Sequence, residues 1–255
     1  MRLMEKINPT PNGFLLIDKP AGPTSHDLVD RLRRVTGIRQ IGHAGTLDPF
    51  ATGLLLFGIG PATKQLNQLV GLGKEYVATF ILGASSDTDD VAGRITKIEG
   101  QKPTTEEIRS VIISRLLGPI EQIPPAYAAI KINGKKMYEA ARAGKPIVAP
   151  PRNVCIDAFE ILNGSKQNED NTLSLPVRIQ CSSGTYIRAL ARDLGSAFGI
   201  GGYVSVLRRT KIGPFFVEEA VVPERIKKES WTEFLLSTDT ILDRLPKDKR
   251  ERILN

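Results

Sequence analysis

A segment around Asp48 places strong constraints on the backbone of this chain. Gly42, Gly45 and Gly53 surround it, and Pro49 follows Asp48 directly. Glycine permits left-handed or crowded backbone, and proline disfavours helical angles at the residue before it. The sequence therefore predicts a rigid turn that aims the Asp48 carboxylate, ahead of the apolar run at 54–57. Because Asp-Pro is also an ordinary turn starter, a chemical role for Asp48 depends on the rest of the chain.

The composition is typical of a globular protein with a basic surface. Of the 255 residues, 41% are hydrophobic and 25% are charged, and the formal net charge is +7. This charge favours a polyanionic partner such as nucleic acid without requiring one. The start of the chain has no apolar signal core, and the apolar stretches fall short of the roughly 20 residues of a membrane helix. We therefore expect a cytoplasmic protein that has no membrane partner.

The few cysteines and histidines exclude several kinds of site. Cys155 and Cys181 form no C-x-x-C pair, so neither a zinc ribbon nor a disulfide scaffold is indicated, and we interpret both as small core residues. With only His26 and His43, a multi-histidine metal site is excluded. No phosphate-binding glycine motif occurs. Any reaction is expected to use carboxylate, hydroxyl and guanidinium groups, without a metal or a cofactor.

Local patterns predict three main helices. Capping boxes place the first helix after Thr24, closed by Gly37, and the second after Thr104, ending before Gly118. The turn at 182–185 is predicted to cap a third helix, which ends before Gly195 and carries two arginines one turn apart, Arg188 and Arg192.

Alternating apolar residues predict strands over 74–83, 173–181 and 203–207. Pro176 indicates an edge or a bulge in the second of these. The acidic segment 87–93 lacks the spacing of a calcium loop, and we interpret it as a solvated turn. Strands that pair at a distance, with helices between them and no regular βαβ repeat, predict an α+β fold with a mixed sheet.

Residues 123–154 differ in character from the rest of the chain. Proline pairs stand near both ends, and a short helix is expected over 137–143. Basic residues surround that helix (Lys131, Lys135, Lys136, Arg142, Lys145 and Arg152). The pattern indicates either a basic excursion from the sheet that binds a polyanion or a merely solvated surface.

Six motifs in register carry a resemblance to a known family. They are Lys19–Ser25, Gly42–Gly53, Tyr76–Ala78 running to Ser86–Gly93, Pro124–Lys131, Gly184–Arg188 and Leu207–Thr210. Together they resemble the TruB family of tRNA pseudouridine-55 synthases over about residues 13–245. The resemblance implies a pseudouridine synthase-like α+β fold, in which helices flank a mixed sheet. It also implies a catalytic domain over 10–245, a basic thumb insertion over 123–154 and a charged tail over 246–255.

The resemblance also implies a reaction and its residues. Such enzymes isomerise uridine to pseudouridine in the T loop of tRNA, so the T arm is the expected partner, with no cofactor and no obligate protein partner. Asp48 falls on the catalytic aspartate, Tyr76 on the tyrosine that stacks against the flipped base, and Arg188 on the arginine that pairs with the aspartate. The remaining substrate-binding positions implied are His43, Tyr186, Leu207, Lys19 and Lys131.

One departure from the family pattern and two alternative functions remain open. Many TruB enzymes continue into a small C-terminal RNA-binding domain, and because 235–243 resembles the segment just before it, that domain is expected to be missing. A non-catalytic RNA-binding protein or tRNA-folding chaperone is the first alternative. A nucleoside hydrolase or glycosidase is the second, although no motif offers the second carboxylate that such enzymes usually need.

Overall fold

The chain folds into two compact units whose segments alternate along the sequence. The computed structural model describes residues 11–128, 130–132, 134–145, 147–247 and 250. The first unit, unit 1, comprises 1–49, 53–70 and 216–255, and unit 2 comprises 50–52 and 71–215.

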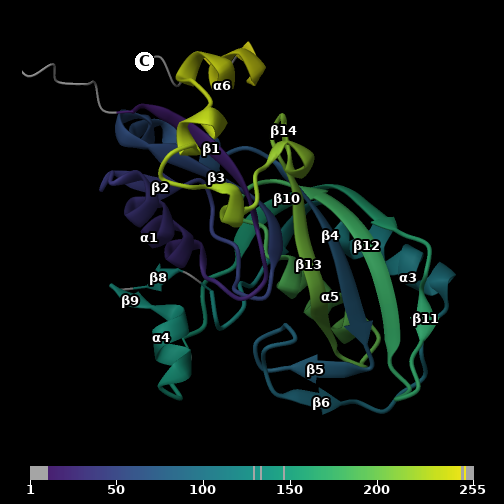
Figure 1. Cartoon of the computed structure of the whole chain (residues 1–255). Helices are drawn as coiled ribbons and strands as arrows, with labels where there is room; N and C mark the ends of the chain where they lie inside the picture. The colour runs from purple at the N-terminus through teal and green to yellow at the C-terminus, as the bar shows by residue number, and fades with distance from the viewer. Residues whose placement is uncertain (1–10, 129, 133, 146, 248–249, 251–255) are drawn as a thin grey trace, which may run out of the picture. The chain divides into compact units, whose positions relative to one another are not determined.

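Unit 1 is built on strand β3 (Thr52–Ile59), which pairs antiparallel with both β1 (Gly13–Lys19) and β2 (Ile41–His43). The apolar run predicted after the Asp48 turn lies inside β3, and its side chains are buried. Helix α1 (Ser25–Thr36) packs beside these strands (Figure 1). The short strand β2 ends directly before the turn that carries Asp48.

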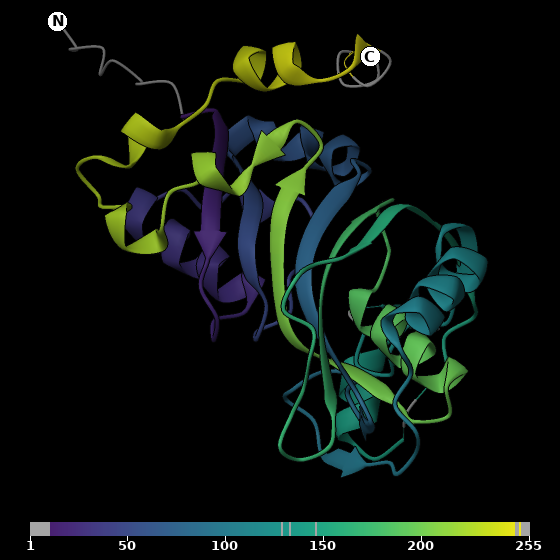
Figure 2. The same ribbon diagram turned by 90° about the vertical axis from the view of Figure 1, so that its right-hand side faces the viewer.

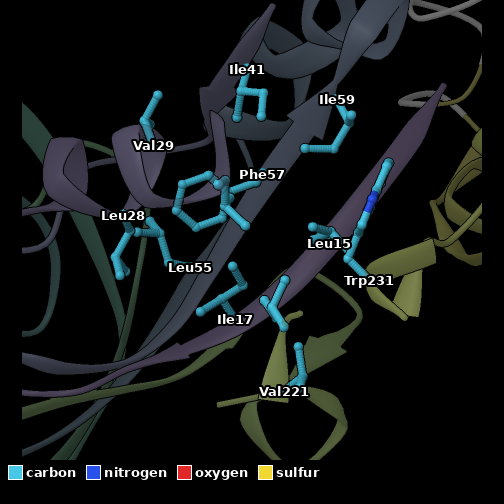
Figure 3. Packing of buried hydrophobic residues seen from close by; sticks show 12 residues of the cluster. Leu15, Ile17, Leu28, Val29, Ile41, Leu55, Phe57, Ile59, Val221 and Trp231 are labelled. Atoms are coloured by element: carbon cyan, nitrogen blue, oxygen red, sulfur yellow. The ribbon is translucent and has the colours of Figure 1, made fainter. Parts of the chain in front are cut away.

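Helix α1 begins and ends where the sequence predicts. The Thr24 and Asp27 side chains each accept from the other's backbone N–H, and Gly37 takes a left-handed φ of 74°. Three of its apolar residues, Leu28, Val29 and Leu32, join the core between the helix and the sheet. Figure 3 shows this core, in which Val221 and Trp231 of the C-terminal segment pack against the residues of β1 and β3.

The remaining elements of unit 1 are short. They are η1 (Gly60–Gln65), α2 (Leu66–Val70), η3 (Val217–Glu219), η4 (Pro223–Arg225), η5 (Trp231–Phe234) and α6 (Thr238–Arg244). Backbone bridges join Leu236 to Phe14 and Val221 to Ile17, so the C-terminal segment is fastened to β1.

Unit 2 contains an antiparallel sheet whose strands follow a non-sequential order. The order is β13 (Gly202–Ile212), β4 (Lys74–Leu82), β12 (Leu173–Cys181), β10 (Arg152–Ile161) and β7 (Gly118–Gln122). Parallel pairing in the described part of this unit is a single bridge between Asp90 and Val204. Helices α5 (Ile187–Ala197) and α3 (Thr105–Val111) lie together beside this sheet (Figure 2). The predicted strands and the α+β class are confirmed.

The other elements of unit 2 are mostly small. They are β5 (Ala84–Ser86), β6 (Ile95–Lys97), the π-helical turn η2 (Ile112–Leu116), β8 (Lys131–Ile132), β9 (Lys135–Lys136), α4 (Met137–Arg142) and β11 (Lys166–Gln167). Strand β14 (Phe215–Phe216) stands at the boundary of the two units. The capping box at Thr104 and the helix expected near 137–143 are both present.

Three local predictions need correction. Pro176 lies in the interior strand β12, but its carbonyl accepts from Leu162 just beyond the end of β10, so its missing N–H faces a gap in the pairing. Helix α5 is capped by Tyr186 rather than by 182–185, and it continues past Gly195 to Ala197. Cys181 is buried as predicted, whereas Cys155 is only half-buried.

Candidate active site

The loop that carries Asp48 is fixed on both sides of the carboxylate within unit 1. On one side, the buried Ser25 hydroxyl accepts from the Leu47 N–H at 2.9 Å and donates to the Leu47 carbonyl at 3.1 Å. On the other side, the Pro49 carbonyl accepts from Lys19 Nζ at 3.0 Å and from the Gly22 N–H at 2.9 Å. Asp48 itself is half-buried. The neighbouring peptide groups therefore set the position from which the carboxylate projects.

The glycines around Asp48 are required for two different reasons. Gly45 and Gly53 have φ angles of 96° and 103°, which side chains with a Cβ rarely adopt. At Gly42 the reason is close packing, because a Cβ would lie 2.9 Å from a methyl carbon of Leu66. The backbone conformation or the packing of this turn thus requires glycine at each of the three positions.

Two further predicted residues belong to the frame of this loop. Lys19 is 0% exposed, and its ammonium donates to the carbonyls of Pro20 and Pro49. Its described contacts therefore position the loop. His43 is the last residue of β2, is half-buried, and packs edge-on against Phe57 with ring centroids 6.2 Å apart.

In unit 2, Tyr76 and Leu207 share one face of the sheet. Tyr76 on β4 stands opposite Arg209 of β13, and Ala78 stands opposite Leu207. Directly opposed residues and residues two apart on a strand point to the same face. Both side chains are buried in the described structure. An aromatic ring and an aliphatic side chain are thus placed side by side.

Arg188 projects from the first turn of α5 into a buried ion pair. Its Nη1 donates to Asp90 Oδ2 at 3.1 Å and to the Thr88 carbonyl at 2.8 Å, and its Nη2 donates to the Tyr127 carbonyl at 3.3 Å. The Arg188 and Asp90 side chains are only 4% and 6% exposed. The interpretation of 87–93 as a solvated turn is therefore wrong, because part of this turn is buried against α5.

A second ion pair lies one helical turn further along α5. Arg192 Nη1 donates to Asp89 Oδ2 at 2.9 Å, and Arg192 Nη2 donates to the Ile123 carbonyl at 2.8 Å. Burial raises the pKa of the Asp89 carboxyl, and the neighbouring Arg192 and Arg188 oppose that rise. The sequence contained a signal for both pairs, since two adjacent aspartates match two arginines spaced i, i+4, but the pairing was not predicted.

Tyr186 and the basic excursion complete the predicted set. Tyr186 is the N-cap residue of α5, two residues before Arg188. Residues 123–151 lie between β7 and β10, whereas 152–154 belong to β10 itself. The side chains of Lys131, Lys135, Lys136 and Arg142 lie outside the described part of the structure, as does most of the predicted tail 246–255. Within the described residues, no cluster of acidic, histidine and cysteine side chains could hold a metal ion.

The two family models that match this chain follow one another along the sequence. The model described as TruB family pseudouridylate synthase, N-terminal domain, matches residues 33–187, more than half of the chain. The chain belongs to the TruB family. The model of the tRNA pseudouridylate synthase B C-terminal domain matches 188–245 of this TruB chain, so the two matches meet inside the first turn of α5.

Curated relatives agree with this assignment. The chain is 49% identical over 212 residues to the tRNA pseudouridine synthase B of Leifsonia xyli subsp. xyli, covering 82% of this chain and 70% of the relative. It is 47% identical over 211 residues to the protein of that name in Mycobacterium leprae, covering 82% and 66%. The similarity to these relatives therefore extends over most of the chain.

Solved structures support the same fold for the TruB chain. A chain in the crystal structure of a Cbf5–Nop10–Gar1 complex is 27% identical, with a TM-score of 0.67, covering 92% of this chain and 62% of that chain. A chain in a structure of an H/ACA RNP bound to a substrate RNA containing 2′-deoxyuridine is 26% identical, with a TM-score of 0.62, covering 94% and 61%. No helix in the described part of the TruB chain is long and apolar enough to span a membrane.

Proposed function

We propose that this TruB family member isomerises uridine to pseudouridine at position 55 in the T loop of tRNA. The observation that carries the proposal is the clamped loop at Asp48, which lies within the segment matched by the pseudouridylate synthase model. The curated relatives bear the name tRNA pseudouridine synthase B, which supports tRNA as the substrate class. A tRNA substrate also favours a cytoplasmic location, which is part of this proposal.

The chemistry needs a fixed carboxylate and no redox partner. The bond between N1 of uracil and C1′ of ribose breaks, the uracil turns, C5 bonds to the same C1′, the C5 proton is released and N1 takes up a proton. Atoms and electrons balance without a cofactor. Asp48 serves this sequence either as a nucleophile or as a base toward the sugar. Both roles require an ionised carboxylate at a fixed position. The contacts of Ser25 and Lys19 with the loop favour that fixed position.

We assign Tyr76, Leu207 and Arg188 to the same reaction. Uridine 55 must leave its stack to react, at a cost of a few kcal/mol that stacking on a protein ring offsets. Tyr76 offers that ring, and Leu207 on the same face excludes water from it. Arg188 is the arginine that we assign to pair with the catalytic carboxylate, and Asp90 and the Thr88 carbonyl hold its guanidinium. His43, Tyr186, Lys19 and Lys131 complete the proposed substrate-binding set, with Lys19 acting through the loop that it holds.

Release of tritium from tRNA labelled at C5 of uridine tests the proposal directly. The purified protein is expected to release about one tritium per tRNA, in buffer containing EDTA and no added cofactor. A tRNA with cytidine at position 55 serves as the matched control and should release none. A non-catalytic RNA chaperone would bind tRNA without releasing tritium, and a nucleoside hydrolase would liberate free uracil. Either of those results would overturn the proposal.

A further inference from the structure

Gln122, the last residue of β7, makes an unusual pair of contacts with the backbone of Tyr186. Its Oε1 accepts from the Tyr186 N–H at 2.8 Å, and its Nε2 donates to the Tyr186 carbonyl at 3.1 Å. The Gln122 side chain is 0% exposed. One side-chain amide thus satisfies both polar backbone groups of Tyr186, as a neighbouring strand would. A buried group with both partners in place holds its neighbour in one orientation.

The position of this contact along the chain gives it a consequence for α5. Tyr186 is the N-cap residue of α5, and no side chain of the helix's own start caps it among the described residues. Its carbonyl also accepts from the Leu190 N–H in the first turn. Gln122 therefore orients the residue from which α5 starts, and Arg188 follows two residues later.

Arg152 holds the ring of the same tyrosine. Arg152 stands directly opposite Gln122 in the pairing of β7 with β10, and its guanidinium carbon lies 5.7 Å from the centroid of the Tyr186 ring. The excursion 123–151 leaves the sheet after Gln122 and returns at Arg152. The Tyr186 ring also packs against the small core of that excursion, formed by Ala128, Met137 and Ala149.

We infer that Gln122 is a positioning residue for pseudouridine formation. It connects the point where the 123–151 excursion leaves the sheet to Tyr186 and Arg188. The inference rests on the proposed function for its effect on rate. Its structural part, the restraint of the Tyr186 backbone by Gln122, stands on the contacts alone. Gln122 touches no substrate in this scheme and acts through the start of α5.

Two substitutions separate positioning from simple stability. Gln122→Met keeps the length of the side chain and removes both hydrogen bonds. It is expected to lower the single-turnover rate constant by about 10- to 100-fold, the range typical of small misplacement of catalytic groups, with tRNA Kd changed far less. Gln180→Met makes the same change at an exposed glutamine of β12 and is expected to leave the rate constant unaltered.

A further variant, Gln122→Glu, adds a pH readout. A protonated glutamate offers one donor and one acceptor, as the amide does. An ionised glutamate can still accept from the Tyr186 N–H, but it places a second acceptor against the Tyr186 carbonyl. The rate constant of Gln122→Glu, divided by that of the wild type at each pH, is therefore expected to rise as pH falls. Rates are taken well below the Tm of each variant. A flat ratio, or a Gln122→Met rate equal to that of the wild type, would overturn the inference.

Amide hydrogen exchange separates failure of this inference from failure of the proposed function. Peptides spanning 182–190 should exchange faster in Gln122→Met than in the wild type or in Gln180→Met, whether or not either protein releases tritium. If the wild type releases no tritium, the proposed function fails and the exchange result alone judges the restraint. Unchanged exchange in Gln122→Met would show that Gln122 does not hold Tyr186.

Discussion

At the scale of single residues, the neighbours of Asp48 hold the loop from which its carboxylate projects. Ser25 and Lys19 hold the peptide groups of Leu47 and Pro49, so a change confined to the Asp48 side chain should leave the loop in place. We predict that Asp48→Asn folds and binds tRNA but forms no pseudouridine, because the amide keeps the shape and loses the charge. Tritium release and filter binding on the same preparation check this, and turnover near the wild-type rate would contradict it.

The sequence allowed some site residues to be predicted and not others. The backbone of the turn at Asp48 was predictable because glycine and proline restrict it locally, and two of its glycines have the predicted positive φ. The residues that hold this turn were not predictable, since Ser25 lies 22 residues from Leu47 and Lys19 lies 30 residues from Pro49. Asp90 was misread because a run of acidic residues usually faces solvent. Its burial follows from Arg188, which lies 98 residues away.

At the scale of elements, local sequence signals predicted where helices begin, but they did not predict features that depend on residues distant in the sequence. The capping boxes at Thr24 and Thr104 are present because a hydroxyl and a carboxylate three residues apart satisfy each other. Helix α5 departs from this rule, and its start is fixed by Gln122 from another element. The interior position of Pro176 was likewise unpredictable, since it depends on where the neighbouring strand β10 stops.

The contact between α5 and the 87–93 turn leads to a prediction about that element. Asp90→Asn leaves Arg188 buried with a weaker partner, and disrupting a buried ion pair costs about 3 to 5 kcal/mol when one charge is removed outright. We predict that Asp90→Asn lowers the free energy of unfolding measured in urea. The loss should be smaller than about 3 to 5 kcal/mol, because asparagine retains one oxygen that can accept hydrogen bonds. The rate of pseudouridine formation should fall as well, because Arg188 loses its fixed orientation.

Asp89→Asn is the matched comparison for this prediction. The Asp89–Arg192 pair is more exposed, asparagine tolerates the φ of 59° at this position, and the raised pKa of the Asp89 carboxyl indicates that its charge is costly to bury. We therefore expect a loss within about 1 kcal/mol. If Asp89→Asn destabilised the protein as much as Asp90→Asn, the two pairs would be equivalent and the buried position of Asp90 would have no special importance.

At the scale of the whole molecule, the net charge of +7 gives tRNA binding a dependence on salt. Removing one phosphate-binding cation lowers the slope of log affinity against log salt by roughly 0.7 to 0.9. We predict that glutamine at Lys131, Lys135, Lys136 or Arg142 lowers the slope by about this amount per substitution, because these basic residues belong to the excursion that Gln122 and Arg152 anchor. Binding isotherms at several salt concentrations measure the slope.

Lys166→Gln, at an exposed position on β11, removes the same charge elsewhere and should change the slope less, since it weakens only the general attraction between protein and tRNA. Equal slopes for Lys166→Gln and the excursion variants would mean that the basic excursion acts only through net charge.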